Sequence, residues 1–186
     1  MKIYPEDTFT QSNNFCKNPQ YWHSTDEDST EIEVSELVAA FIRALQPEYV
    51  IETGTAFGQT TELIGKALIQ NKHGRLISLE IDPQRVLFSK KRCTNLPVQI
   101  LNISSLEFIP EEQIDFIWLD SLLQLRVKEF LKFFPFFTES TIIGFHDTAP
   151  HHILLNYLQE IKHLIKPIFL HTPRGVCFAQ PILNKE

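Results

Sequence analysis

Residues 49–61 read Tyr49-Val50-Ile51-Glu52-Thr53-Gly54-Thr55-Ala56-Phe57-Gly58-Gln59-Thr60-Thr61. The apolar start of this stretch favours a buried strand, and a helix is indicated after it by apolar residues on one face, namely Leu63, Ile64, Ala67 and Leu68. Gly54 lies in the turn between them, where the lack of a Cβ lets a ligand approach the backbone, and Gly58 lets the helix start close to the sheet. This junction is typical of a site for a nucleotide-like ligand.

Two acids near the turn indicate which ligand it suits. Glu52 ends the first predicted strand, where a carboxylate repels phosphate and favours a cationic group such as an ammonium or a sulfonium. Glu80 ends the next predicted strand, about 20 residues after the turn, a spacing at which an acid binds ribose hydroxyls. The turn also lacks the G-x-G-x-x-G pattern of dinucleotide sites. The two acids therefore favour a cationic nucleoside.

Strands alternate with helices along the chain, which predicts an α/β fold with a parallel sheet and helices on both faces. We expect helices to end before Pro47, to begin after Asp82 as N-cap, and to run from Thr148 and Pro150 until Pro167 closes the last one. The last two strands flank a short loop at residues 172–175, which predicts an antiparallel hairpin. The predicted strands are residues 49–53, 76–80, 98–102, 114–120, 141–146, 168–171 and 176–180.

Five stretches resemble, in the family's order, the motifs of the class I S-adenosylmethionine-dependent methyltransferases. Within that class the sequence looks most like the small-molecule O-methyltransferases of the catechol and caffeoyl-CoA type and their bacterial biosynthetic relatives. The stretches are residues 52–61, 79–82, 100–110, 114–120 and 141–148. The resemblance covers roughly residues 37–180 and implies a Rossmann-like methyltransferase fold, whose seven-stranded, mostly parallel sheet ends in an antiparallel hairpin.

The resemblance implies S-adenosylmethionine as cofactor. Ser105 is expected to meet the adenine edge, although both serines of this region also suit N-caps of a short helix. Phe57 is interpreted as a cover for the cofactor or as part of the core. The residues implied to bind the cofactor are Glu52, Gly54, Thr55, Phe57, Gly58, Glu80, Ser104, Ser105 and Asp120.

Asp120, His146 and Asp147 follow the fourth and fifth predicted strands. Neighbouring strands lie about 4.8 Å apart, so these side chains can converge on one ion or one substrate hydroxyl. In the resembling metal-dependent enzymes the matching positions bind a divalent metal, usually Mg²⁺, which holds the acceptor oxygens. The resemblance thus implies that all three residues are catalytic and that all three are metal ligands, with Mg²⁺ or another divalent cation as a second cofactor.

The residue that would act as general base differs from that of the resembling enzymes. The catechol-type enzymes place a lysine three positions after the metal-site aspartate, and this chain has Leu123 there. His146 is the expected substitute because a neutral imidazole accepts a hydroxyl proton near physiological pH, with His151 and His152 as alternatives. In the competing interpretation, His146 pairs with a nearby acid and Asp147 caps the last helix.

Composition agrees with one enzyme-sized domain. With 186 residues, 43% hydrophobic and 22% charged, the chain can bury a full core at residues 31–186, preceded by an N-terminal arm or lid at residues 1–30. Tyr21, Trp22 and His23 suit a surface-packed arm or a lid over the acceptor. The net charge of −6 disfavours a nucleic-acid partner, and three dispersed cysteines suggest reduced thiols.

We therefore expect S-adenosylmethionine-dependent O-methylation of a small molecule, with metal assistance left open. One alternative is a degenerate cofactor-binding domain that transfers no methyl group, favoured by Leu123 and by Ser104 in place of an acid. A nicotinamide-dependent oxidoreductase is disfavoured by the missing glycine. The sequence shows no secretory signal and no apolar run of membrane-helix length, so a cytoplasmic, membrane-free protein is expected, and a homodimer that completes the pocket is left open.

Overall fold

The computed structural model of the chain describes residues 15–25 and 29–183. Helices and strands alternate along it, with single 3-10 turns at Pro19–Tyr21 and Phe134–Phe136. The helices are α1 (Ile32–Leu45), α2 (Gln59–Asn71), α3 (Pro83–Arg92), α4 (Arg126–Phe133) and α5 (Leu154–Leu158). The strands are β1 (Tyr49–Thr53), β2 (Arg75–Glu80), β3 (Val98–Asn102), β4 (Ile114–Leu119), β5 (Phe137–His146), β6 (Ile165–Leu170) and β7 (Val176–Pro181).

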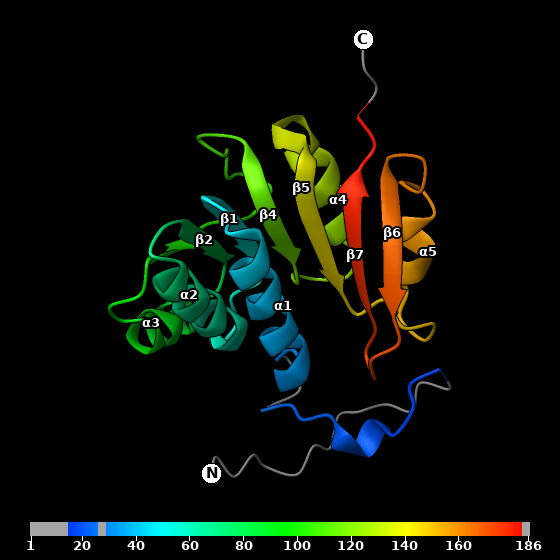
Figure 1. Cartoon of the computed structure of the whole chain (residues 1–186), viewed down its shortest axis with the longest axis horizontal. Coiled ribbons are helices and arrows are strands. Elements are labelled where there is room, and N and C mark those ends of the chain that lie inside the picture. Colours follow the sequence, from blue (N-terminus) through cyan, green and yellow to red (C-terminus); the bar gives the residue numbers. More distant parts are fainter. Residues whose placement is uncertain (1–14, 26–28, 184–186) are drawn as a thin grey trace.

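The seven strands form one sheet in the order β3-β2-β1-β4-β5-β7-β6 (Figure 1). The pairs from β3 to β5 are parallel, and β7 runs antiparallel to both β5 and β6. The predicted mostly parallel sheet with a terminal antiparallel hairpin is therefore confirmed. The strand order reverses beside β1, and in open α/β sheets ligands bind beyond the carboxyl ends of the strands at such a point.

Helices cover both faces of the sheet because neighbouring strand residues point to opposite sides. Val50 packs into an apolar cluster with residues of α1 and α2, whereas Ile51 belongs to a cluster with residues of α4 and α5. In Figure 1, α1, α2 and α3 lie in front of the sheet, and α4 and α5 lie behind it. The two clusters hold the strands in place, so the strand ends present a rigid rim.

The predicted helix end before Pro47 and the predicted helix start after Asp82 are confirmed, and both predicted ends of the last helix are wrong. Asp82 caps α3 by accepting hydrogen bonds from the backbone N–H groups of Gln84 and Arg85. The last helix, however, has only five residues, and β6 begins at Ile165. Pro167 therefore lies inside β6 instead of closing the helix, which is tolerated because β6 is an edge strand.

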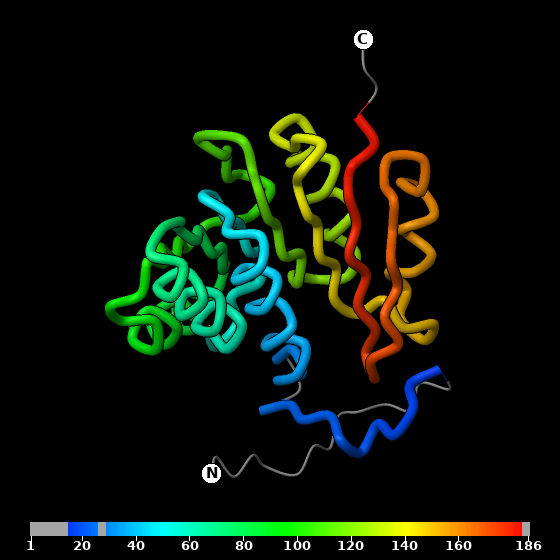
Figure 2. Tube along the Cα trace, in the orientation of Figure 1, coloured from blue at the N-terminus to red at the C-terminus, as the bar shows by residue number. Residues whose placement is uncertain are grey.

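The described part of the N-terminal arm crosses the end of the sheet where the parallel strands terminate (Figure 2). Residues 1–14 and 26–28 of the predicted arm lie outside the described residues. Cys16, Cys93 and Cys177 are buried free thiols, as predicted. Within the described ranges, no helix is both long enough and apolar enough to cross a membrane.

Candidate functional site

The glycine turn packs directly against the end of β4. Gly54 has a φ of +82°, and a Cβ at this position would lie 2.3 Å from the carbonyl oxygen of Asp120. The Asp120 N–H donates to the carbonyl oxygen of Thr53, which ties the two strand ends together. Gly54 is thus required both by its backbone angle and by the close approach of a second strand.

Gly58 serves a different contact from the predicted one. It precedes α2 with a φ of +78°, and an added Cβ would lie 2.9 Å from Cβ of Ser89 on α3. The residue therefore permits a close contact between α2 and α3, not between α2 and the sheet. Phe57 lies next to it and makes an edge contact with Phe88, with ring centroids 5.5 Å apart.

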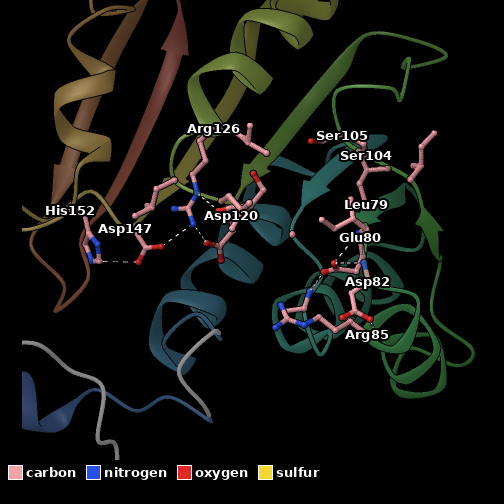
Figure 3. A pocket seen from close by; sticks show the side chains of 18 of the residues that line it. Leu79, Glu80, Asp82, Arg85, Ser104, Ser105, Asp120, Arg126, Asp147 and His152 are labelled. Atoms are coloured by element: carbon pink, nitrogen blue, oxygen red, sulfur yellow. Dashed lines mark hydrogen bonds and ion pairs between the residues drawn. The ribbon is translucent and has the colours of Figure 1, made fainter.

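A cavity of about 530 Å³ opens beyond the carboxyl ends of the parallel strands (Figure 3). Glu80, Asp82 and Arg85 lie at one end of it, and Asp120, Asp147 and His152 lie at the other. The lining includes these predicted site residues: Gly54, Glu80, Ser104, Ser105, Asp120 and Asp147. A second, much smaller pocket is lined by Glu52, Thr55 and Phe57, while Gly58 and His146 line neither of the two.

Glu80 presents a preorganised carboxylate to the cavity. Its two oxygens accept hydrogen bonds from the backbone N–H groups of Ala56 at 2.8 Å, Ile81 at 2.9 Å and Asp82 at 3.0 Å. A carboxylate has about four acceptor positions, so capacity remains for hydroxyl groups of a ligand. The position and the remaining capacity of Glu80 suit the predicted ribose contact.

Glu52 is buried behind the turn instead of facing the main cavity. Its side chain accepts hydrogen bonds from the hydroxyls of Thr61 and Ser78, both at 2.6 Å. Burial raises the pKa of Glu52 from its ordinary value of 4.5 to about 7, against the lowering effect of these two hydroxyls. The carboxyl is therefore held by protein partners, and its predicted role as a partner for a cationic ligand stays a prediction.

The buried Glu52 carboxyl should make the protein less stable as pH rises from 5 to 8. The folded state holds this proton more tightly than the unfolded chain does, so the stabilisation is present below pH 4.5 and is lost as pH rises through about 7. Glu52→Gln removes the effect. Urea unfolding should therefore show the free energy of unfolding of the variant gaining about 2.5 kcal/mol relative to wild type between pH 5 and pH 8.

A matched control is Glu36→Gln on the exposed side of α1, which should follow the wild-type pH dependence. Titrations elsewhere in the chain are common to all three proteins and cancel in the comparison. A gap between Glu52→Gln and wild type that stays constant from pH 5 to pH 8 would contradict the assignment of the titration to Glu52.

Two serines line the cavity above the turn, and their hydroxyls have protein partners. The Ser105 hydroxyl donates to the buried carboxyl of Glu129, and the Ser104 hydroxyl oxygen accepts from the Leu106 N–H at 3.3 Å. Glu129 also accepts from the Thr53 hydroxyl, and burial raises its pKa. Glu129 was missed in the sequence analysis. It lies among the apolar residues of α4 that pack into the core, and no motif marks it as a site residue. The adenine contact of Ser105 stays a prediction.

The three residues predicted to converge do so. Asp120, His146 and Asp147 each offer a ligand atom, and these atoms lie within 4.8 Å of one another. Nδ1 of His146 lies 3.1 Å from Oδ1 of Asp120 and 3.5 Å from Oδ1 of Asp147. The spacing of two strand ends was thus sufficient to predict the grouping.

Sequence reasoning missed the groups that surround this cluster. Nη2 of Arg126 donates to Oδ1 of Asp120 and to Oδ2 of Asp147, both at 2.9 Å. Nε of Arg174, from the loop between β6 and β7, donates to Oδ1 of Asp147 at 2.6 Å. Nε2 of His146 lies 2.6 Å from a carboxylate oxygen of Glu31, the residue before α1.

These partners decide whether the site suits a divalent metal. Three carboxylates, from Glu31, Asp120 and Asp147, face two guanidinium groups and an imidazole. The two guanidinium groups already hold the Asp120 and Asp147 oxygens that would ligate a divalent cation, and such a cation would add positive charge beside them in a buried site. The donor set therefore does not fit a divalent metal, in disagreement with the sequence-based assignment.

His146 does not suit the role of general base either. Burial by itself would lower its pKa, but the carboxylates of Asp147, Asp120 and Glu31 outweigh burial and raise the pKa to about 9. The side chain is fully buried, and both ring nitrogens face acids. At neutral pH the imidazole is a cation inside an ion-pair network, which agrees with the first half of the competing interpretation. The second half is wrong, because the residue before α5 is Ile153 and no side chain caps that helix.

His152 lines the cavity where His146 does not. Its Nε2 atom is buried, has no hydrogen-bond partner within the described part of the chain, and lies 3.7 Å from Oδ1 of Asp147. Burial lowers the pKa of His152 to about 4, with Asp147 opposing and His151 adding to the effect. The imidazole is therefore neutral at physiological pH and can accept a proton.

The described end of the N-terminal arm contacts the site. The Thr30 hydroxyl donates to Oδ2 of Asp120, and Nε2 of Gln59 donates to the Thr30 carbonyl oxygen at 2.7 Å. Tyr21 is mostly exposed, and His23 pairs with Glu33 on α1. The contact with the site is thus made by Thr30 and Glu31, not by the aromatic residues considered as a lid.

Three solved methyltransferases are similar to this chain in fold. A Podospora anserina methyltransferase bound to S-adenosylhomocysteine has a TM-score of 0.69 and 16% identity, covering 83% of this chain and 80% of that one. An O-methyltransferase from Bacillus cereus in complex with S-adenosylhomocysteine has a TM-score of 0.70 and 14% identity, and the match covers 84% of each chain. The third is TomG of Streptomyces achromogenes, an O-methyltransferase of tomaymycin synthesis solved with S-adenosylmethionine. It has a TM-score of 0.67 and 14% identity, and the match covers 83% of this chain and 82% of that one.

These identities are low, so the structures show the fold alone. No curated protein matches the sequence. The sequence profile described as a methyltransferase domain, however, matches residues 51–148, which is more than half of the chain. The match contains the glycine turn, the Glu80 strand end and the whole of β4 and β5. The chain therefore belongs to this methyltransferase family and is a class I S-adenosylmethionine-dependent methyltransferase.

Proposed function

We propose that the chain methylates an oxygen atom of a small hydroxylated molecule, without help from a divalent metal. The observation that carries this proposal is the two-ended cavity, which has the glycine turn and Glu80 at one end and His152 at the other. Its volume of about 530 Å³ lies in the range of small-molecule sites. The O-methyltransferases of similar fold support the choice of oxygen.

Each end of the cavity has a separate task. The Glu80 carboxylate accepts hydrogen bonds from the ribose hydroxyls, and Leu79, Ile103 and Ser104 bound the space for the adenine. Gly54 belongs to this end of the cavity, and Asp120 belongs to the acceptor end. S-adenosylmethionine supplies, when bound, the electrophilic methyl group. The chain mainly aligns the two reactants, which accounts for much of the rate enhancement in such a transfer.

The acceptor end must also remove a proton. Leu122, Leu123 and Arg126 form its wall together with His152. Nε2 of His152 would accept the proton of the acceptor hydroxyl, and the Asp147 carboxylate beside it would stabilise the imidazolium that forms. The acceptor oxygen would take the methyl group from the bound cofactor, which would leave as S-adenosylhomocysteine. His152 thus replaces His146 as the proposed general base.

A domain that binds the cofactor without transferring a methyl group is the competing function. The observation in its favour is Leu123, which stands where the resembling enzymes have a lysine. The two functions agree on the cofactor and differ only in turnover, so binding and turnover must be measured separately.

Calorimetric titration with S-adenosylmethionine, S-adenosylhomocysteine and NAD should give binding of the two adenosyl ligands alone, unchanged by EDTA. Glu80→Ala should weaken S-adenosylhomocysteine binding at least about tenfold, because charge-assisted hydrogen bonds are lost. Binding of NAD, or of none of the three ligands, would contradict the proposal.

Turnover is then measured as S-adenosylhomocysteine release with pairs of acceptors that differ only in a free or a methylated hydroxyl group. The free hydroxyl of a pair should be methylated and its blocked partner should not. Cofactor binding with no turnover across phenolic, sugar and hydroxy-acid pairs would favour the competing function.

A further inference from the structure

A closed network of charged side chains occupies the carboxyl ends of β4 and β5. It joins four parts of the chain that are far apart in sequence, and its central members are nearly inaccessible: the side chains of Arg126, Asp120 and Asp147 are 4%, 10% and 3% exposed. The members are Glu31, Asp120, Arg126, His146, Asp147 and Arg174.

Arg126 is the centre of this network. A single nitrogen, Nη2, contacts one oxygen of Asp120 and one of Asp147, so it lies between the two carboxylates. The rest of the guanidinium is also held, because Nε donates to the Ser121 carbonyl oxygen at 2.8 Å and Nη1 donates to the His146 carbonyl oxygen. The group is fixed by four hydrogen bonds in one orientation.

We propose that the Arg126 guanidinium is the resident cation of this site and that it prevents a divalent ion from binding there. The two oxygens that it bridges belong to residues that could otherwise ligate an ion. Hard divalent cations bind carboxylate oxygens of this kind, with metal–oxygen distances of about 2.0–2.6 Å. Because Arg126 is part of the chain, it competes with an ion at any metal concentration.

The other cations of the network contact the remaining carboxylate oxygens. Arg174 contacts the other oxygen of Asp147, and His146 lies between Asp120 and Glu31. Removing Arg126 alone takes away the partner that Asp120 and Asp147 share and frees the two oxygens that Nη2 had bridged. A buried pair that has lost one partner is strongly destabilising, so a small cation between these oxygens should restore stability. Arg126 thus acts as a positioning residue whose loss should create a metal site.

The experiment measures melting temperature in EDTA, in MgCl₂, in MnCl₂ and in NaCl of equal ionic strength, without cofactor or acceptor. Wild type should melt at the same temperature in all four. Arg126→Ala should melt roughly 10 °C lower in EDTA, and Mn²⁺ or Mg²⁺ should recover at least about half of that loss. Arg126→Lys, which keeps a cation in place, should show no response to the divalent ions.

Arg85→Ala is the matched control, because Arg85 lines the same cavity outside the network and its removal should create no metal response. Calorimetric titration of wild type with Mn²⁺ covers the case in which Arg126→Ala does not fold. No heat of binding up to millimolar Mn²⁺ supports the proposal. Binding to wild type that Asp120→Asn abolishes overturns it, as does a folded Arg126→Ala variant that Mn²⁺ and Mg²⁺ leave unchanged.

None of these readouts needs a cofactor or a methyl acceptor. The proposed methyl transfer can therefore fail while the resident-cation inference stands. If the wild type binds a divalent ion, the resident-cation inference and the metal independence of the proposed reaction both fail, while methyl transfer itself is decided by the turnover measurement alone.

Discussion

Replacing Gly54 by alanine should weaken S-adenosylhomocysteine binding at least about 100-fold and lower the free energy of unfolding by roughly 2–5 kcal/mol. Two costs add. The φ of +82° is strained for any residue with a Cβ, and that Cβ would lie 2.3 Å from the Asp120 carbonyl oxygen and 2.9 Å from Cα of Ser121. Both contacts are with backbone, so the turn and the end of β4 must separate, and the cavity between them changes shape. Calorimetric titration and urea unfolding measure the two effects.

Gly65→Ala is the control, since it makes the same substitution within α2. The atoms nearest to its Cβ would be side-chain atoms of Val98 and Leu96, at 2.8 Å and 3.0 Å, and alanine is preferred over glycine in a helix interior by about 1 kcal/mol. We expect stability within about 1 kcal/mol of wild type and unchanged affinity. A Gly54→Ala protein that binds S-adenosylhomocysteine like wild type would show that the cofactor does not lie against this turn.

The fold could be predicted because its decisive signals are local. A glycine turn after an apolar strand, an acid at the end of the next strand and regular strand–helix alternation each lie within a few residues of one another. The same rule placed Asp120 and Asp147 together, since carboxyl ends of neighbouring parallel strands meet at one edge. Local pattern and tertiary structure agree at these positions.

The errors arose where tertiary contacts outweigh local pattern. Pro167 was expected to end a long helix, but the edge position of β6 tolerates a residue that donates no backbone hydrogen bond. The chain therefore enters β6 at Ile165, and α5 is limited to Leu154–Leu158.

The partners of the predicted acids could not be read from the sequence. Glu31 and Arg174 reach His146 and Asp147 from opposite ends of the chain, and no periodicity connects them. Arg126 is only six residues after Asp120, but its role depends on the side-chain direction at the start of α4. These partners make the acids differ from the metal ligands that the sequence predicted, because guanidinium groups hold the Asp120 and Asp147 oxygens that would bind a metal.

His152→Ala should lower kcat for methyl transfer by about 10²–10⁴-fold, the usual contribution of a general base. His152 is the neutral imidazole that lines the cavity, with Nε2 at 3.7 Å from Oδ1 of Asp147. The effect should be on kcat, with KM and S-adenosylhomocysteine affinity within about threefold of wild type, because Glu80 and the glycine turn are untouched. Initial rates under saturating cofactor separate kcat from KM.

The pH dependence of wild type gives a second readout that a structural role would not produce. Burial, with His151, Arg174 and His146, lowers the pKa of His152 to about 4 against the opposing charge of Asp147. The base is therefore neutral above that pH, and kcat should stay level from pH 6 to pH 8 and fall only as pH approaches 4, where protonation removes the acceptor. The residual kcat of the His152→Ala variant should not show this decrease toward pH 4.

His151→Ala tests whether the effect belongs to His152 itself. His151 is exposed, and its ring centroid lies 4.2 Å from that of His152, so the two variants remove the same group type at adjacent positions. We expect His151→Ala to keep kcat within about threefold of wild type, since no proton is accepted there. If both variants lose activity equally, or if His152→Ala loses it through KM and melting temperature, His152 packs beside the acceptor and does not take its proton. A selective loss of kcat at His152, with cofactor affinity intact, would instead locate proton removal beside Asp147, at the end of the cavity opposite Glu80.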